Sequence, residues 1–273
     1  MSSSNGSVNG LLHEGDAVAS GYQVLEHLSR GRALDVYDAW SLERDCRCIA
    51  KVVRPDRQTP RVRRRLVREG ELLLGLAHPH MVRAYELCRR PRTVLILETL
   101  GGETAEHMIQ SAPRHLAIAD VAHLGLQICS SIGYLHGRGF LHLDLKPSNV
   151  IVAGGQVKVI DLSLARRPGP VPRGLGSPPY LAPEQARGEG ATAATDVWGI
   201  GATLYEAASG ARPFPDARPK LYPQGERRAP SVAESRRAPS RFTEIVGACL
   251  SLEPSVRPSV AELADELDAV IGP

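Results

Sequence analysis

The sequence has no long apolar run and no basic leader segment. None of its 273 residues falls in a stretch of about 20 apolar residues, the length that a membrane-spanning helix needs. The N-terminal segment MSSSNGSVNGLLHEGD has neither the positive start nor the apolar centre of a signal peptide. These two absences predict a cytoplasmic protein with no membrane partner.

Aromatic residues are scarce, and neither sign of charge is in large excess. Phe, Trp and Tyr make up 4% of the chain, and the formal net charge is only +3. The basic run RVRRRLVR at 61–68 and the basic loop at 226–241 have no interleaved aromatic residues on which bases could stack. We therefore expect no nucleic-acid partner. These arginines could instead dock an acidic substrate or protein.

The cysteines do not form a pairing pattern. There are five, scattered along the chain, which fits a reducing compartment better than a disulfide framework. Cys46 and Cys48 could be half of a metal site, but no CxxC partner or His cluster follows them. We interpret both as residues of a strand.

The composition is otherwise that of a folded protein. Hydrophobic residues make up 42% and charged residues 23% of the chain, which is ordinary for a globular domain. Abundant Ala, Arg, Gly and Pro with few Lys are typical of a high-GC bacterial genome. The length allows one large domain or two packed lobes.

The patterning changes at Gly101–Gly102. Residues 1–15 are rich in Ser, Gly and Asn and predict a flexible tail. From there to residue 100 the pattern is mostly short strands, with one helix at 61–76, and after it comes a long amphipathic helix at 117–137. Two further short strands are expected, one from FLHLDL to VIVAG and one in QVKVIDL. The prediction is an α+β fold of two lobes around a cleft, a β-rich lobe at 16–100 and a helical lobe at 101–273.

Two polar motifs in the second lobe carry the chemistry, HLDLKPSN at 142–149 and VKVIDLS at 157–163. Phosphoryl transfer needs a carboxylate to orient the attacking hydroxyl and cations to neutralise the phosphates. Asp144 suits the first role, and Lys146 can reach the transferring phosphate. Asn149 and Asp161 are hard oxygen donors suited to Mg²⁺. A lone Asp in a loop is usually a turn former, but this spacing of Asp, Lys and Asn disfavours that interpretation.

With these motifs the chain resembles the protein kinase family, and in particular the bacterial Hanks-type serine/threonine kinases. Six motifs occur in the family's order from about Tyr22 to Ile271. The resemblance implies one kinase domain at 16–273. It also implies ATP-dependent, Mg²⁺-assisted transfer (with Mn²⁺ as a substitute) to serine or threonine hydroxyls of a protein substrate. The oligomeric state stays open.

The resemblance assigns Lys51, in CIAK, to the α- and β-phosphates of ATP, and it places the acidic partner of that lysine on the helix upstream of His78–Pro79. Counting back gives Glu69. Glu71 competes for this role but lies about 200° further around a helix. A surface pair between Glu69 and Arg65 is the structural alternative.

Other site residues also follow from the resemblance. Those expected around the nucleotide are Gly31, Val36, Ile49, Leu97, Glu98, Leu100 and Ile151. The segment GSPPYLAPE at 176–184 resembles the substrate-binding loop, with Ser177, Pro179 and Tyr180. Asp196 would brace the segment HLDLKPSN at 142–149, here called the catalytic loop, and Glu184 would pair with Arg257 for stability.

The sequence departs from the family pattern near the nucleotide and near the catalytic loop. The loop expected to cover the phosphates, LSRGRALDVY at 28–37, keeps only Gly31 of the three glycines that the family has there. The bulky Ile49 stands where the family usually has Ala. Leu143 replaces the usual Arg before Asp144, and Ser163 replaces a glycine whose freedom at positive φ would be lost. Every group expected to touch a transferring oxygen is present.

Two alternative functions stay open, and the departures support only the first of them. A pseudokinase, a non-catalytic binding module on the same fold, would explain the degraded glycine loop. A small-molecule phosphotransferase would share the two lobes and the Asp-rich loop, but such enzymes lack the GSPPYLAPE-like loop and the DVWGIG helix.

The segment 164–176, here called the activation segment, contains no Ser, Thr or Tyr. We therefore expect activity that does not depend on its phosphorylation.

Overall fold

The computed structural model describes residues 10–272, so residues 1–9 of the predicted tail lie outside it. The chain divides into two compact units after residue 100, except that His78–Met81 belong to the second unit. They do so because the backbone N–H of Val159 donates to the carbonyl of His80 at 2.9 Å, and Met81 forms a bridge with the same residue.

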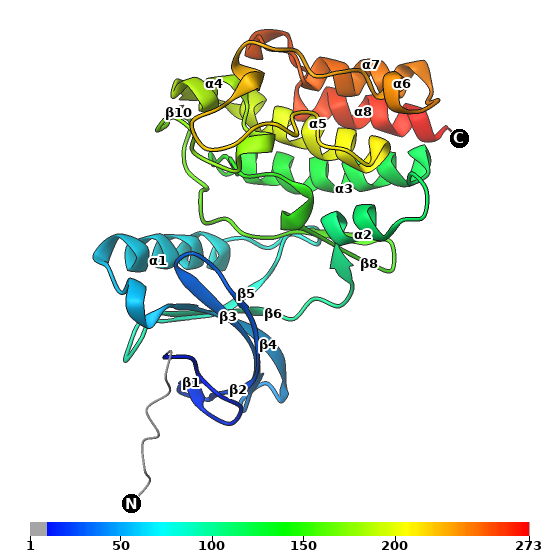
Figure 1. The fold of residues 1–273 in the computed structure, drawn as a ribbon. Coiled ribbons are helices and arrows are strands. Elements are labelled where there is room, and N and C mark those ends of the chain that lie inside the picture. The colour runs from blue at the N-terminus through cyan, green and yellow to red at the C-terminus, as the bar shows by residue number, and fades with distance from the viewer. Residues whose placement is uncertain (1–9, 273) are drawn as a thin grey trace, which may run out of the picture. The chain divides into compact units, whose positions relative to one another are not determined.

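The first unit contains a six-stranded antiparallel sheet in the order β1-β2-β3-β4-β6-β5 (Figure 1). Alternation in β4 buries Cys48, Ala50 and Val52 in the core of this unit and turns Ile49 and Lys51 to the other face. The strands are β1 (Ala17–Ala19), β2 (Tyr22–Arg30), β3 (Leu34–Ser41), β4 (Cys46–Val53), β5 (Ala84–Cys88) and β6 (Val94–Glu98).

One α-helix, α1 (Pro60–Leu74), packs on β5 and β6 of this sheet. It begins where the Thr59 hydroxyl accepts from the backbone N–H of Val62, and Pro60 suits its first turn. Gly70 lets it approach closely, since a Cβ there would lie 2.9 Å from the Leu87 side chain. A short 3₁₀ turn, η1 (Pro55–Arg57), precedes it.

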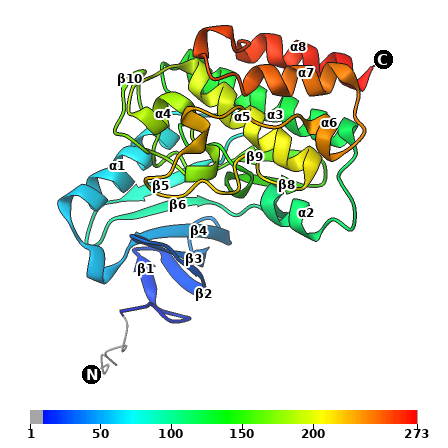
Figure 2. The same ribbon diagram turned by 45° about the horizontal axis from the view of Figure 1, so that its top comes forward.

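The second unit is built around α5 (Ala193–Ser209), which is buried along almost its whole length. It contacts α3 (Ile118–Gly137) and α7 (Ser240–Cys249), and these two helices in turn contact α8 (Val260–Ile271) (Figures 1 and 2). Gly201 makes one of these approaches possible, because a Cβ there would lie 2.5 Å from the Cβ of Cys249. The shorter helices are α2 (Ala105–Ser111), α4 (Pro183–Arg187) and α6 (Val232–Ser235).

Small sheets and turns complete the second unit. The strands β7 (Glu103–Thr104), β8 (Val150–Ala153) and β9 (Gln156–Val159) form one sheet, and β10 (Gly169–Pro170) pairs with β11 (Gly190–Ala191). The 3₁₀ turns are η2 (Pro147–Asn149), η3 (Pro178–Tyr180), η4 (Pro223–Gly225) and η5 (Pro254–Val256).

The strand predicted from FLHLDL to VIVAG is wrong in its first part, because β8 begins only at Val150 and FLHLDL forms no strand. Only Leu141 forms an isolated bridge, with Arg166, and the backbone then leaves the extended conformation at Leu143, where φ is +66°. Across residues 10–272, no helix is both long enough and apolar enough to span a bilayer.

Candidate active site

In the first unit, Lys51 and Glu69 form a close ion pair. The Lys51 Nζ lies 2.7 Å from Glu69 Oε1, and the two side chains are 14% and 0% exposed. Strand β4 directs Lys51 away from the core of this unit, and α1 turns Glu69 inward. Glu71 lies on the exposed side of α1 and pairs with Arg89 at 2.6 Å, as its position around the helix predicts.

Three of the residues expected around the nucleotide share the sheet face that carries Lys51. Val36 is the register partner of Lys51, and Ile49 is the partner of Leu97. Directly opposed residues of antiparallel strands point to the same face, so these side chains form one apolar surface beside the lysine. Of the other expected residues, Glu98 ends β6 and Leu100 follows it, whereas Ile151 lies in β8 of the second unit.

Two arginine contacts, here called clamps, fix the turn between β2 and β3, which contains few glycines. Arg30 donates to both carboxylate oxygens of the buried Asp35 at 2.8 and 3.0 Å. Arg54 Nη1 donates to the carbonyl of Gly31 at 2.9 Å. Sequence reasoning missed these clamps. Only the opposite charges five residues apart, at Arg30 and Asp35, could have indicated one of them.

In the second unit, the carboxylate of Asp144 is held on one side only. Its Oδ2 accepts from Lys146 Nζ at 3.2 Å and from Asn149 Nδ2 at 3.4 Å. Its Oδ1 is buried and has no hydrogen-bond partner among residues 10–272. Lys146 Nζ also donates to Ser177 Oγ at 2.6 Å, so one ammonium joins the catalytic loop to the substrate loop.

Asp196, near the start of α5, fixes the backbone that leads to Asp144. Its carboxylate accepts from the N–H of His142 and from the N–H of Leu143, both at 2.8 Å, and contacts the His136 ring nitrogen at 2.8 Å. These bonds hold Leu143 in the left-handed conformation, which costs a non-glycine residue about 1–3 kcal/mol.

Asn149 and Asp161 suit a hard cation. The N–H of Ile160 donates to the Asn149 carbonyl at 2.9 Å, so Asn149 lies next to the residue that precedes Asp161. The Asn149 Nδ2 donates to the Asp144 carbonyl at 2.9 Å, which leaves the Asn149 amide oxygen as the atom that could bind a metal ion. An amide and a carboxylate oxygen fit Mg²⁺ or Mn²⁺. Asp161 takes a positive φ of +66°, whereas Ser163, which replaces the family's glycine, does not.

The substrate loop is attached at several points. The buried Tyr180 hydroxyl donates to Glu206 Oε2 at 2.6 Å, and Pro179 lies half-buried in η3. Gln185 Nε2 donates to the carbonyls of Leu143 and Leu175, both at 2.9 Å, and so links the catalytic loop to the activation segment. Sequence reasoning missed Gln185, because no local pattern indicates contacts with residues 42 and 10 positions away.

An apolar cluster stands where the family's Arg would receive a phosphate. Leu143 is buried with Leu141, Val171 of the activation segment and Ala191 of β11. The pairing of β10 with β11 places Val171 there. Apolar contacts with Leu141 and Leu143, and the backbone hydrogen bonds between β10 and β11, thus fix the position of the activation segment within the second unit.

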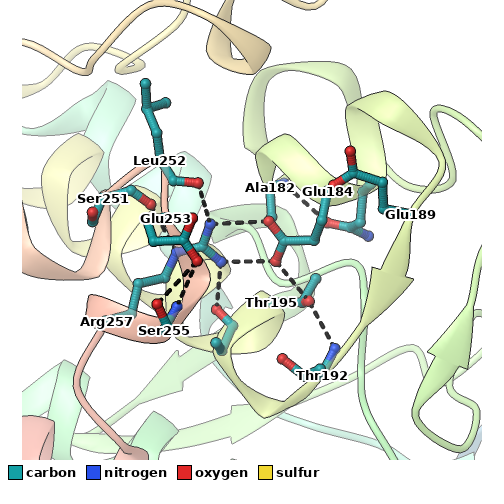
Figure 3. Close-up of polar contacts among 12 residues, drawn as sticks. Ala182, Glu184, Glu189, Thr192, Thr195, Ser251, Leu252, Glu253, Ser255 and Arg257 are labelled. Atoms are coloured by element: carbon teal, nitrogen blue, oxygen red, sulfur yellow. Dashed lines mark hydrogen bonds and ion pairs between the residues drawn. The ribbon is translucent and has the colours of Figure 1, made fainter.

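Glu184 and Arg257 form a bidentate ion pair at 2.8 and 2.9 Å (Figure 3). The Arg257 side chain is 0% exposed, and its remaining donors reach the carbonyls of Ser251 at 2.8 Å and Ala194 at 2.9 Å. The Thr195 hydroxyl donates to Glu184 Oε1 at 2.8 Å. The pair joins α4 to the end of η5 and contacts the start of α5.

The fold and these clusters are those of a protein kinase domain, and comparison with known proteins agrees. The family model described as protein kinase domain matches residues 22–267. The chain belongs to this family, whose members use ATP and Mg²⁺.

Its similar relatives include animal and bacterial serine/threonine kinases. Human "Myosin light chain kinase 3" is 30% identical over 72% of this chain, and rabbit "Myosin light chain kinase 2, skeletal/cardiac muscle" is 34% identical over 60%. "Probable serine/threonine-protein kinase PknB" of Lactococcus lactis is 31% identical over 75%. The matches cover 25%, 28% and 34% of these relatives, so the chain spans between a quarter and about a third of their length.

Proposed function

We propose that the protein is an active serine/threonine kinase that transfers the γ-phosphoryl group of ATP to hydroxyls of protein substrates. The environment of Asp144 carries the proposal. Its Oδ2 is fixed by Lys146 and Asn149, whereas its Oδ1 is buried without a partner among residues 10–272. A buried acceptor without a donor is costly, and a substrate hydroxyl would satisfy it.

In the proposed reaction, Asp144 Oδ1 accepts the hydrogen bond of the substrate hydroxyl, orients its oxygen for attack and takes its proton. Lys146, already between Asp144 and Ser177, places a positive charge beside the transferred group. Lys51, held by the buried Glu69, binds the α- and β-phosphates of the same nucleotide. Asn149 and Asp161 would hold Mg²⁺, which neutralises charge on the phosphates.

A pseudokinase is the second candidate, and the glycine-poor loop with Ile49 favours it. The contacts of Arg30 and Arg54 at the turn between β2 and β3 show how an active kinase could tolerate the loss of glycines, because they can order this loop.

We further infer a cytoplasmic role in bacterial signalling. The composition and the five free thiols support this inference.

The test is transfer of ³²P from γ-labelled ATP to proteins of a heat-inactivated bacterial lysate, with and without EDTA. Label should enter proteins only with Mg²⁺ and the wild-type chain, and Asp144→Asn should lower incorporation by at least about 100-fold. The matched control is Asp265→Asn, the same chemical change at an exposed position of α8. Equal incorporation by Asp144→Asn and Asp265→Asn would contradict the proposal.

A further inference from the structure

Two acidic residues, Glu206 and Glu106, lie near Tyr180 of the substrate loop. Glu206 of α5 is 5% exposed and accepts from the Tyr180 hydroxyl. Arg212, just after α5, places its Nε 3.7 Å from Glu206 Oε1 and its Nη2 3.3 Å from Glu106 Oε1 of α2. The guanidinium carbon is also 5.9 Å from the centre of the Tyr180 ring.

This arginine occupies the position in which a cationic substrate side chain could bind. Two carboxylates and an aromatic ring around one guanidinium make a binding site for an arginine or lysine side chain. Arg212 fills that site from within the chain while remaining 40% exposed itself. A guanidinium at the rim repels a second cation.

Stability alone does not account for the arrangement. Ion pairs with a partly exposed member contribute little to folding, and here the contact to the buried carboxylate is the longer of the two. Burial raises the pKa of Glu206, and the hydrogen bond from Tyr180 and then the charge of Arg212 oppose that rise. The arginine therefore covers a buried carboxylate beside the substrate loop.

We propose that Arg212 is a specificity-determining residue, which cancels a preference for basic substrates. With Arg212 in place, an arginine close to the phosphorylated hydroxyl gains nothing from Glu206 and Glu106. Without it, both carboxylates become available. The inference rests on the proposed kinase function, because it takes Tyr180 to be part of a peptide-binding loop.

The experiment measures peptide binding and phosphoryl transfer separately. Serine peptides carry alanine or arginine at each of the four positions before the serine, and fluorescence anisotropy gives the Kd of each. Arg212→Gln removes the charge, Arg212→Lys keeps it, and Arg241→Gln removes an arginine whose partner is Glu266 on α8.

The wild type, Arg212→Lys and Arg241→Gln should bind the alanine and arginine peptides with Kd values within about threefold of each other. Arg212→Gln should bind at least one arginine peptide about tenfold more tightly than its alanine counterpart, the ratio that one charge-assisted hydrogen bond provides. An unchanged ratio in Arg212→Gln, or no peptide binding by any variant, would overturn the inference. Binding with the expected ratios but no transfer would contradict only the proposed catalytic activity.

Discussion

Replacing Arg257 by methionine should lower the free energy of unfolding by about 3–5 kcal/mol. The change removes the guanidinium and keeps a long apolar side chain. Glu184, whose side chain is 3% exposed, would then keep only the Thr195 hydroxyl as a neutral donor. Glu184→Gln should be costly for the complementary reason, since it leaves a guanidinium that is 0% exposed without a counter-charge.

The magnitude follows from burial and from the number of bonds lost. Arg257 makes two bonds to the carboxylate and further bonds to backbone carbonyls, all out of water (Figure 3). An exposed pair of the same type, Arg241 with Glu266 at 2.6 Å, is the control. Arg241→Met should cost no more than about 1 kcal/mol.

Urea unfolding followed by circular dichroism measures these free energies. The double variant Glu184→Gln/Arg257→Met should lose less than the sum of the two single variants, because neither charge is then left buried alone. The reasoning is refuted if Arg257→Met costs no more than Arg241→Met, or if the two single losses at 184 and 257 simply add.

Three further predictions concern activity. Lys51→Met should lower phosphoryl transfer at least about 100-fold, and it should also lower the melting temperature because it removes the counter-charge of the buried Glu69, so circular dichroism checks that the variant is folded; equal activity would exclude Lys51 from the site. Phosphoamino-acid analysis should find phosphoserine and phosphothreonine, as the Lys146 and Ser177 contact suggests, and predominant phosphotyrosine would contradict this. Phosphatase treatment should leave activity unchanged, because Leu143 and Val171 replace a phosphate contact; a loss reversed by autophosphorylation within 161–184 would overturn it.

The parts of the account that the sequence could predict depend on local spacing. Asp144, Lys146 and Asn149 lie within six residues, and the phase of α1 separates Glu69 from Glu71. The change of pattern after residue 100 predicted two lobes, and the resemblance of the motifs to the protein kinase family predicted the kinase fold.

The rest depends on contacts between distant segments, which no periodicity reveals. Arg54 reaches Gly31, and Gln185 reaches Leu143, through single side chains. The missing strand in FLHLDL has the same cause. Its alternation is correct for a strand, but bonds from Asp196, more than 50 residues away, hold the backbone in another conformation.

The central claim is that Asp144 performs chemistry and does not merely help to bind the nucleotide. The measurement that tests it most directly is the Kd of Mg-ATP alongside the single-turnover rate of phosphoryl transfer, for the wild type and Asp144→Asn. The account predicts Kd values within about threefold and a transfer rate at least about 100-fold lower in the variant. A wild-type chain that binds Mg-ATP but transfers nothing, or a variant that transfers at the wild-type rate, would contradict it.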